Sequence, residues 1–348
     1  MNRLANLAGL GTEVWVDGLL PPRELERLVH DAVTGLTSNP TIFRAAVLGD
    51  PRYAGRIAAL GDLPPEARYE ALAFEEVQAA TDVLAPAGLV SLEVASSLAD
   101  DAEGTVEAAR ELWSRVDRAN AMIKIPATPA GIEATRRVIA DGSSVNVTLL
   151  FSVAVHAAVM EAYLGGLEER VARGLRVDHI RSVASFFVSR VDTAVDRLLA
   201  ERGRDDLAGR AAVANARLAH AGAERLFGRA RFATLARAGA KPQRVLWAST
   251  GTKDPHYSDV KYVEELAGPG VTNTMPPATL VAFRDHGRAY DALTASEPAA
   301  RRALADVAAA GVDLDAVTAR LLDDGVAAFA TSMDELLAGI STRQEERA

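Results

Sequence analysis

Eight short apolar runs, separated by segments with helical periodicity, constrain the fold of this chain more than any other feature. Short strands that alternate with helices are typical of parallel sheets, because two parallel neighbours need a crossover between them. Eight such units predict an α/β protein with a (β/α)8 TIM barrel and additional helices. A doubly wound open sheet is the alternative, disfavoured because no glycine-rich dinucleotide fingerprint follows the first run. The runs lie at residues 13–17, 33–39, 89–94, 121–126, 144–149, 181–188, 244–249 and 270–273.

The length of the chain permits one large domain or two, since its 348 residues are 49% hydrophobic and α/β barrels often run past about 250 residues as one unit. We expect a single barrel domain over residues 1–340. A long, alanine-rich helical insertion is expected around residues 204–240, and further helices follow the eighth run. Residues 341–348 are expected to form a loose tail.

Charge and cysteine content exclude several classes of function. The net charge is −9 and the isoelectric point about 5.3, and the basic residues are spread without a run. Nucleic acid and anionic membranes are therefore poor partners, and an anionic small substrate would need a local positive pocket. The absence of cysteine excludes disulfides, thiolate metal sites and a cysteine nucleophile.

The start of the chain and its apolar stretches predict a location. Residues 1–12 are too polar and too short for a signal peptide, and no stretch approaches a transmembrane length. We therefore expect a cytoplasmic protein, and the sequence leaves open whether it is a monomer or a homodimer.

Lys124 is a single charge inside the apolar run 121–126. The chain has only four lysines among its 38 Lys and Arg residues, so the other 34 are arginine. Burial on a strand disfavours the ammonium form, and a neutral amine attacks carbonyl groups, whereas arginine stays charged. Lys124 is therefore a candidate Schiff-base residue. The alternative is a lysine at a strand end whose ammonium reaches solvent.

Polar residues at the ends of the first six runs form a candidate site with Lys124. In a barrel the carboxyl ends of all strands open on one mouth. Residues two apart on a strand face the same side, which pairs Asn146 with Thr148 and Ser185 with Phe187. The set is Asp17, Asn39, Glu93, Lys124, Asn146, Thr148, Ser185 and Phe187.

Imine chemistry requires this combination of groups. It needs an amine, an acid/base to expel water from the carbinolamine, and a second base to take a hydroxyl proton as a carbon–carbon bond breaks. Taken singly, each residue has a structural alternative: Asp17 and Asn39 as turn or cap residues, and Glu93 as a salt-bridge partner. Their joint placement at strand ends favours a site.

Two segments after the sixth and seventh runs suggest a phosphate site. Arg190 is expected in the first turn of a helix, where backbone N–H groups and the helix dipole favour an anion. The residues from Ser249 to Lys253 combine small hydroxyl groups, a glycine and a cation. Barrel enzymes often bind phosphate in this part of the ring. The alternatives are an ordinary surface arginine and a solvated turn.

Several motifs resemble those of transaldolases, and together they cover nearly the whole chain. They are residues 37–43 (TSNPTIF), 123–128 (IKIPAT), 146–149 (NVTL), 186–192 (FFVSRVD), 247–250 (WAST) and 272–276 (TNTMP). The resemblance implies an α/β barrel transferase of the pentose phosphate pathway that needs no cofactor or metal. It would move a dihydroxyacetone unit from sedoheptulose 7-phosphate to glyceraldehyde 3-phosphate.

The resemblance also implies roles for the catalytic residues. Lys124 matches the Schiff-base lysine, and Glu93 the residue that works through a water beside Thr148 in imine formation and hydrolysis. Asp17 matches the carboxylate that handles the substrate hydroxyl proton at carbon–carbon cleavage.

The remaining matched residues would bind substrate. Asn39, Asn146 and Ser185 match residues that hold the dihydroxyacetone part, Phe187 lines it, and Arg190 and Ser249 match phosphate ligands. One position departs from the pattern: many members carry an arginine two residues after that serine, where this chain has Gly251. We predict that Lys253 takes its place as a point charge without the bidentate fork of arginine.

Three other functions are compatible with parts of this pattern. A small aldolase of the same broad family would release free dihydroxyacetone. A glycosidase would use Asp17 and Glu93 as paired carboxylates, but it gives Lys124 no role. A catalytically silent sugar-phosphate-binding protein would have no reason to keep an amine and two carboxylates together.

Overall fold

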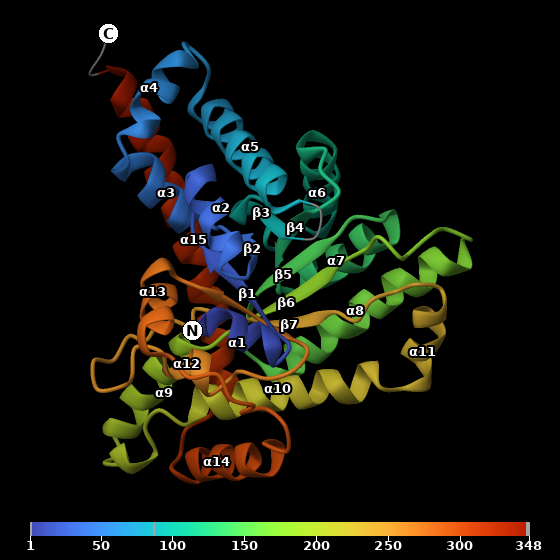
Figure 1. Ribbon diagram of the computed structural model, residues 1–348, viewed down its shortest axis with the longest axis vertical. Helices are drawn as coiled ribbons and strands as arrows, with labels where there is room; N and C mark the ends of the chain where they lie inside the picture. The colour runs from blue at the N-terminus through green and yellow to red at the C-terminus, as the bar shows by residue number, and fades with distance from the viewer. Residues whose placement is uncertain (1, 86–87, 346–348) are drawn as a thin grey trace.

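The computed structural model describes residues 2–85 and 88–345 and contains a closed barrel of parallel strands in chain order (Figure 1). The last strand pairs with the first, in the register Trp15 to Thr274. The predicted (β/α)8 TIM barrel is therefore confirmed, and the open sheet is excluded. The strands are β1 Thr12–Asp17, β2 Val33–Thr37, β3 Leu89–Glu93, β4 Ala121–Pro126, β5 Val145–Leu150, β6 Ser182–Phe187, β7 Arg244–Ala248 and β8 Val271–Met275.

Helices surround the barrel and extend beyond its regular crossovers (Figure 1). The helices are α1 Arg3–Gly9, α2 Pro22–His30, α3 Pro40–Gly49, α4 Arg52–Ala59, α5 Pro65–Leu84, α6 Ala102–Val116, α7 Pro129–Asp141, α8 Val153–Ala172, α9 Ser189–Ala200, α10 Ala211–Phe227, α11 Ala230–Arg237, α12 Lys261–Glu264, α13 Pro277–His286, α14 Glu297–Ala309 and α15 Leu314–Glu345. The 3-10 helices Ser96–Leu98 and Asp205–Leu207 complete the set. Helices α10 and α11 occupy most of the segment predicted as a helical insertion.

The second strand ends at Thr37, and Asn39 follows it as predicted. Asn39 adopts an extended backbone and its Oδ1 accepts a hydrogen bond from the backbone N–H of Ile42 at 3.0 Å. It is therefore the N-cap of α3, and Pro40 fills the first helical position, where no backbone N–H is needed. This local signal turns the chain from strand to helix at the barrel mouth.

Trp15 fills the barrel interior below the mouth. Its side chain is fully buried and it pairs in register with Gly35 on β2. A Cβ on Gly35 would lie 2.4 Å from the indole ring, so only glycine leaves room for this aromatic plug. Asp17 is two residues further along β1 and therefore points to the same side, one layer nearer the mouth.

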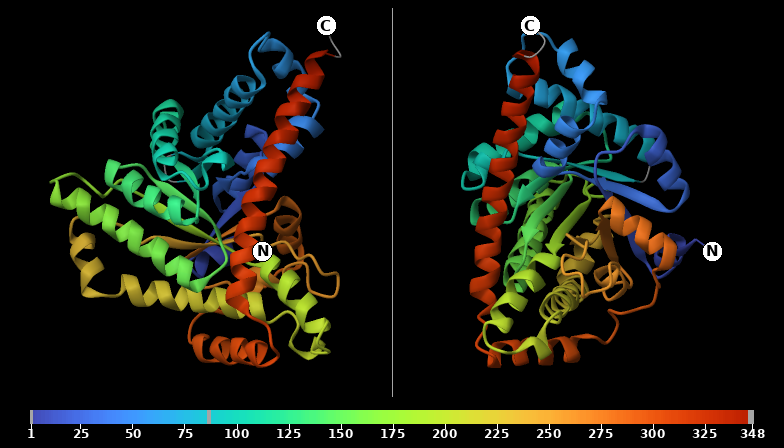
Figure 2. Two further views of the ribbon diagram at one scale, coloured as in Figure 1. Left: turned by 180° about the vertical axis from the view of Figure 1, so that it is seen from behind. Right: turned by 90° about the vertical axis from the view of Figure 1, so that its left-hand side faces the viewer.

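Helix α15 runs nearly the length of the molecule, from α14 at one end to α3 and α4 at the other (Figure 2). It continues to Glu345, so the prediction of a loose tail is wrong for residues 341–345, and residues 346–348 lie outside the described part. The helix is anchored by the buried Leu336 and Ile340 just before this segment, and the hydroxyls of Ser341 and Thr342 donate to backbone oxygens one turn earlier. Within residues 2–85 and 88–345, no helix combines the length and apolarity needed to cross a membrane.

Candidate active site

A cavity of about 170 Å³ opens at the carboxyl ends of the strands, and we call it the reaction cavity. Nine of the eleven predicted site residues line it; Glu93 and Asn146 do not, and they contact lining residues from outside. The lining residues are Asp17, Thr37, Asn39, Thr41, Ile42, Lys124, Thr148, Ser185, Phe187, Arg190, Ala248, Ser249, Gly251, Lys253, Thr274, Pro276 and Phe329.

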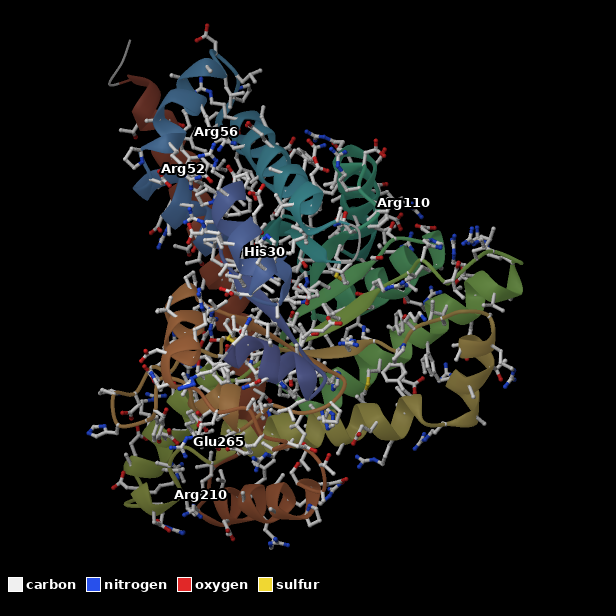
Figure 3. The ribbon with its side chains drawn as sticks, in the orientation of Figure 1. His30, Arg52, Arg56, Arg110, Arg210 and Glu265 are labelled. Atoms are coloured by element: carbon white, nitrogen blue, oxygen red, sulfur yellow. The ribbon has the colours of Figure 1, made fainter. Side chains whose placement is uncertain are left out.

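Lys124 is buried in the cavity wall, with its side chain 4% exposed. Its Nζ donates to the backbone oxygen of Ser38 at 3.0 Å and to Glu93 Oε2 at 3.1 Å. Unlike Lys124, which is on a barrel strand, the arginines Arg52, Arg56 and Arg110 lie on helices outside the barrel (Figure 3). The amine is therefore not a strand-end lysine reaching solvent. It is held in one position beside a carboxylate.

Glu93 lies beside Lys124 because β3 and β4 pair in that register. Burial raises the pKa of the Glu93 carboxyl, the charge and hydrogen bond of Lys124 oppose that rise, and the nearby Asp17 adds to it. A carboxyl whose pKa is raised toward neutrality is suited to donate and accept protons during a reaction.

Asp17 is partly buried in the wall of the cavity, and two threonines fix its carboxylate. Thr37 donates from Oγ1 to Asp17 Oδ1 at 2.7 Å, and the hydroxyls of Thr37 and Thr274 lie 2.6 Å apart. Because Thr37 gives its proton to Asp17, Thr274 is the donor of the second bond. Burial raises the pKa of Asp17, whereas the charge of Lys124 and the hydrogen bond from Thr37 lower it.

Asn146 is held by a chain of hydrogen bonds across three strands. Ser185 donates from Oγ to Asn146 Oδ1 at 2.7 Å, and Asn146 Nδ2 donates to Ser91 Oγ at 3.0 Å. Both ends of the amide are therefore bonded, the oxygen to one serine hydroxyl and the nitrogen to the other. Ser185 lines the cavity and presents this network to it.

Thr148 has a buried hydroxyl that makes no hydrogen bond to any described residue. It lines the reaction cavity at the end of β5, where the pairing with β6 is irregular and the next residue, Leu149, has a φ of +59°. An unpaired buried hydroxyl is costly, and so is a left-handed backbone outside glycine. The unpaired Thr148 hydroxyl and the left-handed Leu149 backbone therefore point to a place where a polar group of a ligand binds inside the cavity.

The other side of the cavity carries positive charge. Arg190 is the second residue of α9, and its guanidinium carbon lies 5.4 Å from the centre of the Phe187 ring. Burial lowers the pKa of Arg190, which still remains a cation at neutral pH. Lys253 is exposed but lines the same cavity, and among the described residues neither cation forms an ion pair. An unpaired cation at a helix N-terminus, Arg190, and a second cation on the neighbouring loop suit an anionic group.

Ser249 is turned toward this positive side by a strained backbone. Its φ is +54°, and its Oγ lies 3.0 Å from that of Ser189 at the start of α9. The backbone N–H of Ser189 donates to the oxygen of Ser249 at 3.1 Å, which ties the end of β7 to α9. The predicted phosphate ligands therefore lie on two connected elements.

Some residues of the site were not predicted from the sequence. Thr37 and Thr274 lie within motifs that the sequence analysis quotes, but their contact with Asp17 depends on the closure of the barrel. Phe329 comes from α15, and its ring centre lies 5.6 Å from Lys124 Nζ. No local signal distinguishes it from an ordinary core residue. Over the described residues, no group of three or more His, Cys, Asp or Glu side chains is arranged to hold a metal.

The fold and this site define a (β/α)8 barrel enzyme with a buried lysine at its mouth. The family model described as Transaldolase/Fructose-6-phosphate aldolase matches residues 14–340. The transaldolase of Neisseria gonorrhoeae (strain ATCC 700825 / FA 1090) is 45% identical over 352 residues, which cover 97% of this chain and 99% of that protein. The transaldolase of Thiobacillus denitrificans (strain ATCC 25259 / T1) is 46% identical over 360 residues, covering 98% and 100%.

The chain therefore belongs to the transaldolase/fructose-6-phosphate aldolase family and is a transaldolase-type enzyme. The glycosidase and the silent binding protein are excluded by this result.

Proposed function

We propose that the enzyme transfers a dihydroxyacetone unit from sedoheptulose 7-phosphate to glyceraldehyde 3-phosphate through a Schiff base on Lys124, in the non-oxidative pentose phosphate pathway. The observation that carries the proposal is the buried Lys124 amine, held 3.1 Å from Glu93 in the cavity that Asp17 also lines. The curated relatives are named transaldolase, which supports the substrates.

In the first step Lys124 adds to the ketone carbon of the donor and forms a carbinolamine. Glu93 supplies a proton to the carbinolamine hydroxyl through a water held beside Thr148, and water leaves as the C=N bond forms. The raised pKa of Glu93 supports this role, because it keeps a proton available nearer to neutral pH.

In the second step Asp17 takes the proton of the substrate hydroxyl next to the bond that breaks. The electrons of the carbon–carbon bond move toward the iminium nitrogen and leave an enamine on Lys124, while a four-carbon aldose phosphate departs. The enamine carbon then attacks the aldehyde of the acceptor, and Asp17 returns its proton to the new hydroxyl. Hydrolysis of the final imine releases a six-carbon ketose phosphate and frees Lys124.

The remaining residues would bind the sugar phosphates. Asn39 and Ser185 hydrogen-bond the hydroxyls of the dihydroxyacetone part, Asn146 holds Ser185 in place for this role, and the Phe187 ring lines it. Asn39 has its amide nitrogen left for this role, since its oxygen caps α3. In this proposal the phosphate lies against Arg190, Ser249 and Lys253, the positive side of the reaction cavity.

Reductive trapping tests the proposal. Borohydride is added in the presence of fructose 6-phosphate, and the protein is digested for peptide mapping. We expect one stable three-carbon or six-carbon adduct, on Lys124. The absence of an adduct on that residue would overturn the mechanism.

A second candidate is an aldolase that releases free dihydroxyacetone, because the matching family model names fructose-6-phosphate aldolase as well. Comparing donor cleavage with and without glyceraldehyde 3-phosphate separates the two. A transferase consumes the donor steadily only when the acceptor is present, whereas an aldolase does so without it.

A cytoplasmic location and assembly as a monomer or homodimer are also proposals. Cell fractionation and native mass spectrometry test these two points.

A further inference from the structure

Phe329 closes one side of the reaction cavity from a helix near the far end of the chain. Its side chain is 3% exposed, and the ring centre lies 5.6 Å from Lys124 Nζ. It also lines a separate cavity of about 10 Å³ next to Glu93. The Phe329 ring therefore forms the part of the cavity wall that α15 contributes, next to both Lys124 and Glu93.

Polar contacts fix α15 against the mouth of the barrel. Ser332, three residues after Phe329 and so on the same helix face, has its Oγ 2.9 Å from that of Thr41, which lines the reaction cavity. Arg44 of α3 forms an ion pair with Glu335, one further turn along α15. These contacts hold the helix at a defined distance from the cavity.

Close packing at the preceding turn sets the same distance. Gly325 precedes Phe329 by four residues, and a Cβ at this position would lie 2.9 Å from Leu149 Cδ2. Leu149 is the residue with a φ of +59° that follows Thr148. The helix therefore rests on the strained end of β5, beside the hydroxyl that no described residue satisfies.

Phe329 differs from the other core residues of α15. Leu336 and Ile340 are fully buried, but they pack against the other core cluster and do not line the reaction cavity. Phe329 belongs to the core cluster that surrounds Lys124, and it also lines the cavity in which the amine lies. An imine on that amine is a group whose lifetime depends on access of water.

We propose that Phe329 is a positioning residue that limits access of water to the bond between Lys124 and the three-carbon intermediate, and so sets how much dihydroxyacetone is transferred and how much is released. The inference rests on the proposed function, because it concerns the intermediate on Lys124.

The two fates of the intermediate differ in the use of water. In release, the enamine carbon takes the proton that Asp17 removed at cleavage, the oxygen of one water adds to the resulting iminium carbon, and the C–N bond breaks to give dihydroxyacetone and protonated Lys124. In transfer, the enamine carbon attacks the acceptor first, and water is used only after the new carbon–carbon bond exists. A wall that slows the arrival of water before the acceptor binds therefore favours transfer.

The test compares Phe329→Ala and Phe329→Leu with the unchanged protein, using fructose 6-phosphate as donor and glyceraldehyde 3-phosphate as acceptor. Free dihydroxyacetone and the transfer product are measured in the same reaction. We expect the ratio of released to transferred product to rise roughly threefold to tenfold in Phe329→Ala and by less in Phe329→Leu. This ratio does not depend on the fraction of protein that is folded, so a purely structural role leaves it unchanged.

Leu336→Ala is the matched control, since it opens a buried hole on the same helix away from the cavity. It should leave the ratio unchanged. An unchanged ratio in both Phe329 variants, or an equal rise in Leu336→Ala, would overturn the inference. Borohydride trapping on Lys124 in the unchanged protein separates that result from failure of the proposed function, which would show as the absence of the adduct.

Discussion

The two sides of the reaction cavity are built in different ways. On the amine side, Asp17, Glu93 and Lys124 come from strands of the barrel, and hydrogen bonds from neighbouring strands hold each of them. On the phosphate side, Arg190 and Lys253 come from a helix start and a loop, and among the described residues neither has an ion-pair partner. Strand pairing fixes the positions of the residues on the first side, whereas the residues of the second side lie on connections, which are less constrained than strands.

The largest effect is expected on the amine side, from Lys124→Arg. Arginine keeps the positive charge beside Glu93 but is not a nucleophile. We expect transfer activity to fall by about 10⁴-fold or more, and the borohydride adduct to disappear. Lys241→Arg, at an exposed position, is the matched control and should retain full activity. Substantial transfer by Lys124→Arg would contradict the assignment of this side of the cavity as the reaction centre.

Asp17→Asn should lower kcat by about 10²- to 10⁴-fold while the donor imine still forms, because the base is lost but Lys124 and Glu93 remain.

In the unchanged protein, burial raises the pKa of Asp17. As the pH falls, Asp17 therefore becomes protonated at a higher pH than an ordinary aspartate does, and the enzyme loses its base there. Thr37→Val removes a hydrogen bond that lowers this pKa, so the acid limb of kcat/KM should move to higher pH. An acid limb that stays in place would exclude Asp17 as the titrating base.

The sequence predicted the amine side more completely than its surroundings, for a physical reason. Strands buried on both faces read as apolar runs, so a polar residue within one, such as Lys124, stands out. Thr37 and Thr274 gain their role only when β1, β2 and β8 meet. Phe329 reaches Lys124 because of how a distant helix packs. Helix α15 also continues through residues 341–345, where local composition suggests a tail.

The scaffold of the phosphate side should respond to pH through Asp192. This residue follows Arg190 by two positions on α9, is 1% exposed, and accepts from Ala212 N–H at 2.7 Å and from Tyr262 O–H at 2.9 Å. Burial raises its pKa to about 6, above the value near 4 expected in the unfolded chain. The folded protein therefore binds this proton more tightly, and the stability gained at low pH is lost as pH rises through about 6.

Asp192→Asn tests this effect, since asparagine keeps the acceptor for Ala212 without titrating. The difference in the free energy of unfolding between the two proteins should change by about 3 kcal/mol or less between pH 4 and pH 7, in favour of the variant at pH 7. Urea unfolding at several pH values measures it. A difference that does not vary with pH would show that Asp192 keeps its charge in the folded protein.

The smallest effects are expected from the phosphate ligands, and they should differ from each other. Arg190→Ala removes a buried cation at a helix N-terminus, so the KM for the sugar phosphate should rise roughly 10- to 100-fold. Lys253→Ala removes an exposed point charge, and the rise should be roughly threefold to tenfold. Both changes should vanish with unphosphorylated fructose as donor.

Placing at residue 251 the arginine that the motif resemblance implies sharpens this last comparison. A Cβ at Gly251 would lie 3.3 Å from Thr279 Oγ1 and 3.4 Å from Pro276 Cγ, so these neighbours need to move by only a few tenths of an ångström. Gly251→Arg should therefore be accommodated and, combined with Lys253→Ala, should bring the KM back toward that of the unchanged protein, because a bidentate guanidinium replaces the lost ammonium. If Lys253→Ala leaves KM unchanged, Lys253 does not replace that arginine, and Arg190 and Ser249 bind the phosphate without it.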